Sequence, residues 1–281
     1  MIDLHTHTNI SDGTDTPSML INKALAQGLT TVALTDHDTI GGWDEATTHL
    51  RSGLDLVLGS EISCQTTDGI SVHMLGLLFD PTYGPLQDVL TQTRDNRHGR
   101  MERIIGKMNT AGIDISMADV LAQLSDGATL GRPHLADALV AKKVVASREE
   151  AFAELLHNSS AHYVAHYSPT PEEVIALIKA AGGVAVIAHP FASLRGRIIS
   201  SESFAPMVAA GLDGIEVSHR DQTIEQRDLL NQIARDFDLV QTGSSDYHGT
   251  GKLNQLAEFT TDPSEWEKLE SRANARRVIR I

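Results

Sequence analysis

Short apolar runs alternate along the chain with segments whose apolar positions recur at helical spacing. Residues 1–7 (MIDLHTH) predict a strand, and residues 16–29 predict a helix with Thr16 as its N-cap and Pro17 at its first position. The alternation continues with predicted strands at 30–37, 55–63, 70–79, 184–190, 214–219 and 239–248, and predicted helices at 41–52, 171–183, 201–211 and 223–237. Such repetition of strand and helix is typical of an α/β fold, here a βα barrel.

The strands stop over roughly residues 84–165. Helical spacing there predicts helices at 86–112, 116–125, 132–143 and 147–158. We interpret residues 84–165 as a small all-helical insertion that caps the substrate site, and residues 1–83 and 166–281 as the barrel. An insertion placed after a strand end would lie where the active-site loops of a barrel gather.

Composition narrows the class of protein. The chain has 281 residues, of which 41% are hydrophobic and 21% charged, which suits a globular domain with a large core. One cysteine, Cys64, permits neither a disulfide framework nor a thiolate zinc site. We expect a cytoplasmic protein, because the sequence shows neither a secretory leader nor an apolar run that would span a membrane. The net charge of −14 argues against binding of long duplex nucleic acid, although a local cluster could still bind small anions.

Two histidines near the start of the chain introduce the candidate chemistry. Residues i and i+2 of a strand share a face, so Asp3, His5 and His7 are predicted to project side by side. Two neighbouring imidazoles repel each other when protonated but begin a metal site when neutral.

Further metal-ligating residue types fall at the predicted strand ends or in the loops beside them. With the first pair they make six imidazoles and three carboxylates without sulfur: His5, His7, Asp12, His37, Glu61, His73, His189, Asp246 and His248. Any one of these histidines alone is as well explained by a hydrogen-bonded core or surface residue. Together they suit Mn, Fe or Zn, and nine ligands are too many for one ion. We therefore expect two or three divalent ions, with Glu61 as the natural bridge.

The motifs DLHTHTNISDGT, ALTDHDT, GSEIS, VHMLGL, AHP and GSSDYHG, in this order, resemble those of the PHP (polymerase and histidinol phosphatase) superfamily. The inserted GRPHLADALV resembles the branch of nucleoside 3′,5′-bisphosphate phosphatases and RNase AM-type exoribonucleases. The resemblance implies a distorted (β/α)7 TIM-like barrel with a trinuclear site. It assigns a first ion to His5, His7, Glu61 and Asp246, a second to Asp12, His37 and His248, and a third to Glu61, His73 and His189. Several relatives have Ser directly after the two histidines, where this chain has TNIS.

Two other carboxylates near these motifs receive different interpretations. Asp36 lies beside His37 and is expected to orient a metal ligand, because ligating histidines usually donate their second N–H to a carboxylate or carbonyl. Asp38 could equally be the N-cap of the following helix.

Basic residues of the insertion are candidates for phosphate binding. Arg97 and Arg100 lie three apart on one helix face, and Arg132 opens the next helix. The Arg guanidinium matches phosphate oxygens, although a solvated helix face explains Arg97 and Arg100 as well. The branch resemblance places a substrate-binding Arg at 132. Of two histidines that compete for the last metal position, we assign His189, at the end of an apolar strand, to metal and His134 to substrate.

Arg197, in the loop after the AHP motif, is a further candidate phosphate contact. We expect the remaining histidines to lie on the surface: His49, His98, His157, His162, His166 and His219.

The sequence thus favours a metal-dependent phosphoesterase in which a metal-bound hydroxide attacks phosphorus. By the resemblance, the substrate is a nucleoside 3′,5′-bisphosphate that loses its 3′-phosphate. The alternatives are 5′-to-3′ removal of nucleotides from short 5′-phosphorylated RNA, hydrolysis of histidinol phosphate, a non-catalytic metal-binding module and an amidohydrolase. An amidohydrolase would normally need a Lys or a carboxylated bridging group at a strand end, and none of the predicted strand ends carries Lys.

Overall fold

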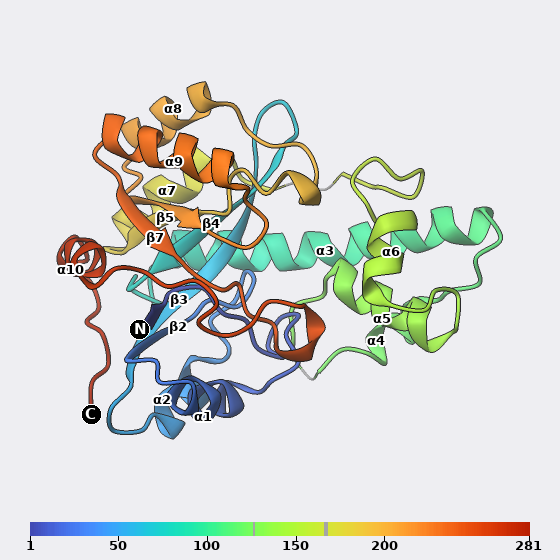
Figure 1. The fold of residues 1–281 in the computed structure, drawn as a ribbon. Coiled ribbons are helices and arrows are strands. Elements are labelled where there is room, and N and C mark those ends of the chain that lie inside the picture. The colour runs from blue at the N-terminus through green and yellow to red at the C-terminus, as the bar shows by residue number, and fades with distance from the viewer. Residues whose placement is uncertain (126, 166–167) are drawn as a thin grey trace.

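The computed structural model describes residues 1–125, 127–165 and 168–281. Its strands form one seven-stranded sheet in sequence order: β1 (Ile2–Asp3), β2 (Thr31–Leu34), β3 (Asp55–Gln65), β4 (Ser71–Leu77), β5 (Val184–Ala188), β6 (Gly214–Ser218) and β7 (Val240–Gly243). An isolated parallel bridge between Thr6 and Tyr247 brings the two ends of the sheet together. The sheet therefore curls into a nearly closed barrel (Figure 1), which confirms the predicted fold class.

The barrel is distorted because β4 runs against its neighbours. β3 and β4 form an antiparallel hairpin, β4 and β5 are also antiparallel, and the other pairs are parallel. The prediction that the candidate ligands lie at strand ends or in the loops beside them is wrong for Glu61, which lies in the middle of β3, whereas His73 is the third residue of β4, near its amino end. The amino end of an antiparallel strand lies at the same edge as the carboxyl ends of its neighbours, so His73 still reaches the barrel mouth.

Helices cover the outside of the barrel: α1 (Pro17–Ala26), α2 (Trp43–His49), α7 (Pro171–Ala180), α8 (Phe204–Ala209) and α9 (Ile224–Asp236). The predicted start of α1 is confirmed, since Thr16 Oγ1 accepts a hydrogen bond from the Met19 amide and Pro17 follows it. A helix that the strand–helix alternation did not predict, α10 (Pro263–Ser271), contributes Trp266 and Leu269 to the cluster inside the barrel.

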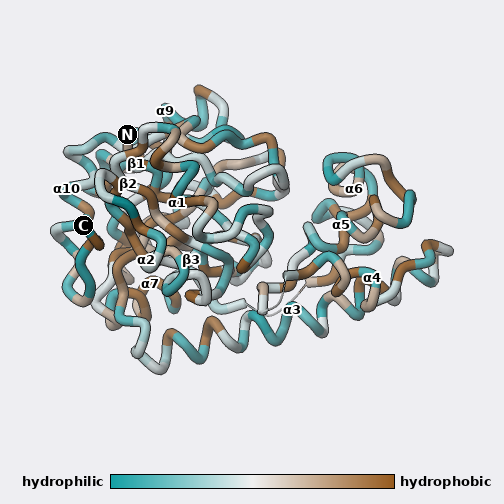
Figure 2. Tube along the Cα trace, turned by 90° about the horizontal axis from the view of Figure 1, so that it is seen from below, coloured by the Kyte–Doolittle hydropathy of each residue, from teal (hydrophilic) through white to brown (hydrophobic). Residues whose placement is uncertain are grey.

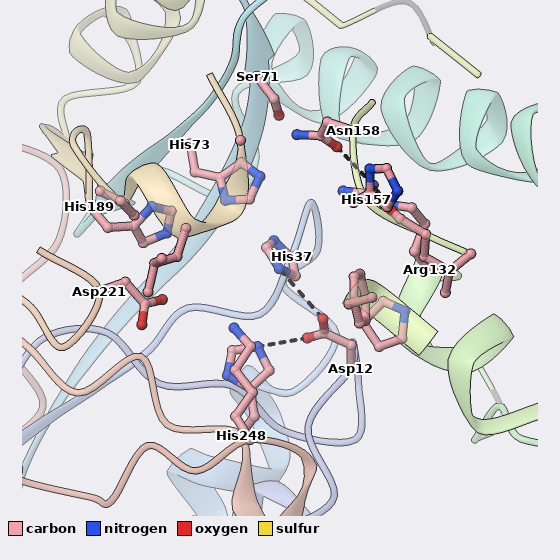
Figure 3. A pocket seen from close by; sticks show the side chains of 18 of the residues that line it. Asp12, His37, Ser71, His73, Arg132, His157, Asn158, His189, Asp221 and His248 are labelled. Atoms are coloured by element: carbon pink, nitrogen blue, oxygen red, sulfur yellow. Dashed lines mark hydrogen bonds and ion pairs between the residues drawn. The ribbon is translucent and has the colours of Figure 1, made fainter. Parts of the chain in front are cut away.

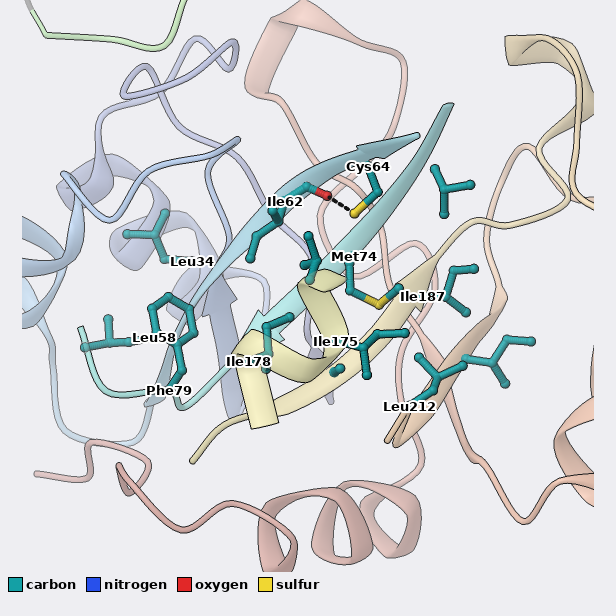
Figure 4. Close-up of a cluster of buried hydrophobic side chains, with 14 of the residues drawn as sticks. Leu34, Leu58, Ile62, Cys64, Met74, Phe79, Ile175, Ile178, Ile187 and Leu212 are labelled. Carbon is teal, nitrogen blue, oxygen red and sulfur yellow. Dashed lines mark hydrogen bonds between the residues drawn. The ribbon is translucent and has the colours of Figure 1, made fainter. Parts of the chain in front are cut away.

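Alternation along the strands separates two hydrophobic layers. Leu58, Met74 and Ile187 pack outward against the helices (Figure 4), whereas Val57 and Leu75 belong to the cluster that fills the barrel. Residues of the same parity as Val57 and Leu75 face inward, and these include Glu61 on β3 and His73 on β4. The strand pattern therefore directs both polar side chains to the mouth above the apolar interior.

Four of the helices between β4 and β5 form the insertion, which extends away from the barrel (Figure 2), although Leu86 and Leu90 in the first half of its longest helix belong to the outer cluster of the barrel. The four helices are α3 (Gly84–Thr110), α4 (Met117–Leu121), α5 (Arg132–Ala141) and α6 (Arg148–Glu154). Met108, Val120 and Leu139 belong to a hydrophobic cluster of their own, distinct from the two barrel clusters. The contacts that connect this body to the mouth include a hydrogen bond from the Thr129 amide to Ile10 O at 2.9 Å and one from Arg148 Nη1 to Gly251 O at 3.0 Å.

Candidate metal centre

Glu61 is the hub of the residues at the barrel mouth. Its Oε2 lies 3.2 Å from His5 Nε2, 3.0 Å from His7 Nε2 and 3.1 Å from His37 Nδ1. Its Oε1 lies 2.7 Å from His73 Nδ1 and 3.1 Å from His189 Nε2. Both carboxylate oxygens thus face imidazoles on different sides, which is the arrangement expected of a bridging ligand.

The first group of donor atoms lies at the two ends of the sheet. His5 Nε2 and His7 Nε2 are 3.0 Å apart, and Asp246 Oδ1 is 3.4 Å from each. None of these residues is inside a regular strand, because β1 ends at Asp3 and β7 at Gly243. Asp246 also has a left-handed backbone, with φ of +51°. Strand parity therefore does not bring these side chains together; the bridge between Thr6 and Tyr247 does.

A second group forms around Asp12. Its Oδ1 lies 3.1 Å from His248 Nε2 and its Oδ2 lies 3.7 Å from His37 Nε2 (Figure 3). The ring of His7 stacks on that of His248 with centroids 4.1 Å apart. Asp12, His37 and His248, together with His7, offer ligand atoms that all lie within 4.8 Å of one another.

His73 and His189 complete the cluster through Glu61, and the structure brings all nine predicted ligands together. The side chain of His73 is 25% exposed, whereas the other eight residues are buried. Asp3 is the exception to the predicted row of side chains: its carboxylate accepts the amides of Ser245 and Ala257 instead. Burial raises the pKa of Asp3 to about 6.

The electrostatics of the cluster are those of carboxylates surrounded by imidazoles. Burial raises the pKa of Glu61, but His73, His37 and His5 outweigh burial and hold this pKa well below its usual range. Burial lowers the pKa of His7, yet Asp246 and Glu61 raise it to about 9. Burial, with Lys252 and His7, lowers the pKa of His248 to about 4. Cations bound at this cluster would displace protons from its imidazoles, since metal ligands must be deprotonated.

Glu216 on β6 belongs to the centre and was missed in the sequence. It is fully buried; its Oε1 lies 3.1 Å from His5 Nδ1, and its Oε2 accepts the amide of His189 at 2.8 Å. A carboxylate on the second ring nitrogen fixes which nitrogen of His5 faces the cluster. The signal was available, since a glutamate in the middle of the apolar strand GIEVS would be buried only for a reason.

His219 contradicts its assignment to the surface. It is fully buried, and its Nε2 lies 3.5 Å from Asp246 Oδ2. Lys252, which was also missed, donates to the same oxygen at 3.0 Å and lines the cavity. Oδ1 of Asp246 therefore faces His5 and His7, while Oδ2 is held by His219 and Lys252.

Asp36 and Asp38, on either side of His37, stabilise the neighbouring chain through hydrogen bonds. Asp36 accepts from the amide and hydroxyl of Thr8 at 2.8 and 2.6 Å and from the Ser11 hydroxyl at 2.6 Å, which shapes the loop that carries Asp12. The N-cap prediction for Asp38 is wrong, since Gly42 precedes α2. Asp38 instead accepts from the Ser63 amide at 2.7 Å and from Arg97.

A cavity of about 490 Å³ lies over the cluster, between the barrel and the helical body (Figure 3). Arg100 and Arg132 line it, and neither has a carboxylate at ion-pair distance among the residues that the structure describes. Arg132 Nη1 donates to Leu156 O at 2.6 Å and to Asn158 Oδ1 at 2.8 Å. Burial, and then the charge of Arg132, lowers the pKa of Arg100 to about 9. Two partly buried like charges that lack a carboxylate partner among the described residues form a site that favours an anion.

The other predicted substrate residues differ in their surroundings. Arg97 lines the cavity, but its Nη2 contacts Asp38 and Ser63, so it also ties α3 to the barrel. Arg197 lines the cavity with 65% of its side chain exposed and donates to Asp68 O at 2.6 Å. His134 is buried and does not belong to the described cavity lining; its Nδ1 accepts the Gly131 amide and caps α5.

Of the remaining histidines, His98 is exposed, and His49, His157 and His162 are partly buried. His157 also lines the cavity. His166 lies outside the described residues. In the part of the chain that the structure describes, no helix combines the length and apolarity needed to cross a bilayer.

Comparison with known proteins gives consistent matches. The model of the PHP domain family matches residues 3–198. The chain is 36% identical to a 5′-3′ exoribonuclease of Haemophilus influenzae, covering 88% of this chain and 89% of the relative. It is 31% identical to a 3′,5′-nucleoside bisphosphate phosphatase of Chromobacterium violaceum, covering 96% and 97%. A solved structure from Bifidobacterium adolescentis, described as a candidate metal-dependent phosphoesterase, superposes with a TM-score of 0.91 at 42% identity, covering 97% and 96%.

Proposed function

The chain belongs to the PHP domain family of metal-dependent phosphoesterases, and on that premise we propose that it hydrolyses a phosphate ester at the 3′-oxygen of a nucleotide. The substrate we propose first is a nucleoside 3′,5′-bisphosphate that loses its 3′-phosphate. The observation that carries this proposal is the position of Arg100 and Arg132, which line the same cavity as Asp12, His37 and His248. A substrate with two phosphates would place one phosphate at the two arginines and the other at the metal-ligand cluster.

The donor set fits divalent cations. The Nε2 atoms of His5 and His7 lie 3.0 Å apart, with a carboxylate oxygen of Glu61 beside both. Two ring nitrogens this close are unfavourable neighbours without a cation between them, but with the carboxylate they form a good set of metal ligands. We propose that the nine predicted residues hold two or three ions of Mn, Fe or Zn. Such ions, when bound, neutralise phosphoryl oxygens and lower the pKa of water.

The chain's own residues supply orientation. Glu216 holds His5 and the backbone of His189, and Asp36 shapes the loop of Asp12. The guanidinium groups of Arg100 and Arg132 would bind the phosphate that does not react. Binding of the unreactive phosphate would hold the reacting phosphate over the cluster in one orientation. This orientation lowers the entropic part of the activation free energy.

We also propose that residues 84–165 act as a cap on the barrel formed by residues 1–83 and 166–281. The separate hydrophobic cluster of the helical body supports this division. Arg100 lies on α3 and Arg132 at the start of α5. The cap would therefore hold the unreactive phosphate at a fixed distance from the metal centre.

A second substrate class follows from the same bond. In a 5′-phosphorylated oligonucleotide, the phosphorus on the first 3′-oxygen carries the rest of the chain. Hydrolysis there forms a bond from water oxygen to phosphorus, breaks the bond to O3′ and transfers a proton to O3′. The products are a nucleoside 5′-phosphate and a shortened 5′-phosphorylated chain. The name of the Haemophilus influenzae relative favours this alternative.

The test measures inorganic phosphate released from nucleoside 3′,5′-bisphosphates, and mononucleotide released from dinucleotides, with Mn²⁺ added. We expect turnover that Glu61→Gln lowers by more than about 100-fold, since an outer-shell partner alone is typically worth 10–100-fold. Glu225→Gln, at the exposed start of α9, is the matched control. No turnover of either substrate above a metal-free sample would refute the proposal.

A further inference from the structure

Two strongly exposed leucines line the same cavity as the metal-ligand cluster. Leu194 is 88% exposed and Leu253 is 64% exposed. Leu194 lies in the short helix η1 (Ser193–Arg195) after β5, and Leu253 lies just after η3 (Gly249–Gly251), which follows β7. Ile198, which is 37% exposed, lines the cavity as well, whereas the exposed Ile224 and Leu229 on α9 are not among the described residues that line it.

The backbone on which each leucine stands is anchored. Leu253 O accepts from Arg220 at 3.1 Å, and the adjacent Lys252 donates to Asp246 at 3.0 Å. The Ser193 hydroxyl, next to Leu194, accepts from Gln226 at 3.1 Å. The chain beside each leucine is therefore anchored at the rim of the cavity, where both leucine side chains remain exposed.

The leucines belong to the barrel side of the cavity, and the arginines to the cap side. In Figure 3, His189 and Asp221 lie across the cavity from Arg132 and Asn158, with the cluster of Asp12 and His248 between the two sides. Leu194 follows β5 just beyond His189, and Leu253 is adjacent to Lys252, which contacts Asp246. A nucleotide with its 5′-phosphate at the arginines and its 3′-phosphorus at the cluster would direct its next substituent toward these leucines.

We propose that Leu194 and Leu253 form an apolar subsite for the base of the nucleotide that follows the scissile bond. The proposal rests on the proposed function and extends it to oligonucleotides. Nucleobases offer flat faces of low polarity, and apolar contact stabilises them without regard to base identity. A nucleoside bisphosphate has no group at this position, so the two leucines would matter only for a chain of two or more nucleotides.

The test compares two 5′-phosphorylated dinucleotides, one with a base on the second nucleotide and one abasic there. We expect kcat/KM of the wild type to be about tenfold higher with the base, because contact between a base and leucine side chains removes apolar surface of both from water. Leu194→Ser combined with Leu253→Ser should bring this ratio close to one. The matched double variant Ile224→Ser with Leu229→Ser should keep the ratio. Equal kcat/KM for the two dinucleotides in the wild type would overturn the subsite.

Binding separates failure of the subsite from failure of the proposed function. Calorimetry with dinucleotides in which a methylene group replaces the scissile O3′ measures affinity without turnover. A base-dependent affinity that the leucine variant loses supports the subsite even if no substrate is hydrolysed. An affinity independent of the second base overturns it while hydrolysis of bisphosphates can stand. Light scattering tests whether a second copy of the chain occupies the leucines instead. If the wild type is a dimer and the leucine variant a monomer, the leucines serve self-association and the subsite is overturned.

Discussion

Replacement of Glu216 by Gln tests how the metal centre is held in place. The carboxylate accepts from two donors, with Oε1 at 3.1 Å from His5 Nδ1 and Oε2 at 2.8 Å from the His189 amide. A glutamine amide has the same shape but offers only one acceptor oxygen. His189 also has a φ of +31°, in the left-handed region, and its buried amide donates to Glu216.

Either orientation of the amide disturbs one of the two contacts. With its oxygen toward His189, the NH2 group faces His5 Nδ1 and favours the tautomer that carries its proton on Nε2, the atom aimed at Glu61 and His7. With its oxygen toward His5, the NH2 group faces the His189 N–H, and an unpaired buried donor costs about 1–3 kcal/mol. Partners of metal-bound histidines are typically worth 10–100-fold in metal affinity. We expect the Kd for Mn²⁺ of Glu216→Gln to rise by about 10–100-fold.

The assay is calorimetric titration of the metal-depleted protein with Mn²⁺, beside circular dichroism to show that the barrel is folded. Glu225→Gln should bind as the wild type does, because Glu225 lies outside the centre in the first turn of α9. A folded Glu216→Gln protein whose Kd changes by less than twofold would refute the view that Glu216 orients His5 and His189.

Three other outcomes follow from the contacts. Dialysis against a chelator should abolish hydrolysis, which added Mn²⁺ restores; activity that survives chelation would contradict the metal requirement. Arg132→Gln should raise KM for a nucleoside bisphosphate about tenfold with little change in kcat, whereas Lys142→Gln, on the far end of α5, should not; an unchanged KM would count against the phosphate role. Tyr247→Phe removes the 2.7 Å hydrogen bond to buried Asp15 and should lower the free energy of unfolding by about 1–3 kcal/mol in urea titration; equal stability would show that Lys23 alone satisfies Asp15.

Much of the centre could be predicted from the sequence because its residue types are rare in such positions. Imidazoles and carboxylates at the ends of apolar runs identify ligand candidates before their neighbours are known, and all nine candidates meet at one mouth. Glu216 and His219 escaped this search. Glu216 lies inside a strand, and His219 follows one without a partner nearby in sequence, so only packing against His5 and Asp246 reveals them.

The sequence by itself determined most helices and strands and the type of chemistry, because hydrophobic period, capping residues and donor type are local properties of the chain. Thr16 and Pro17 start α1 in any surroundings that permit a helix, and a set of donors without sulfur excludes thiolate chemistry. Only the tertiary structure decided the direction of β4, which brings His73 to the mouth, and the ion pair that turns Arg97 toward Asp38. Strand direction and ion-pair choice depend on residues distant in the chain, whose competition is settled by which arrangement buries the apolar interior and pairs its charges.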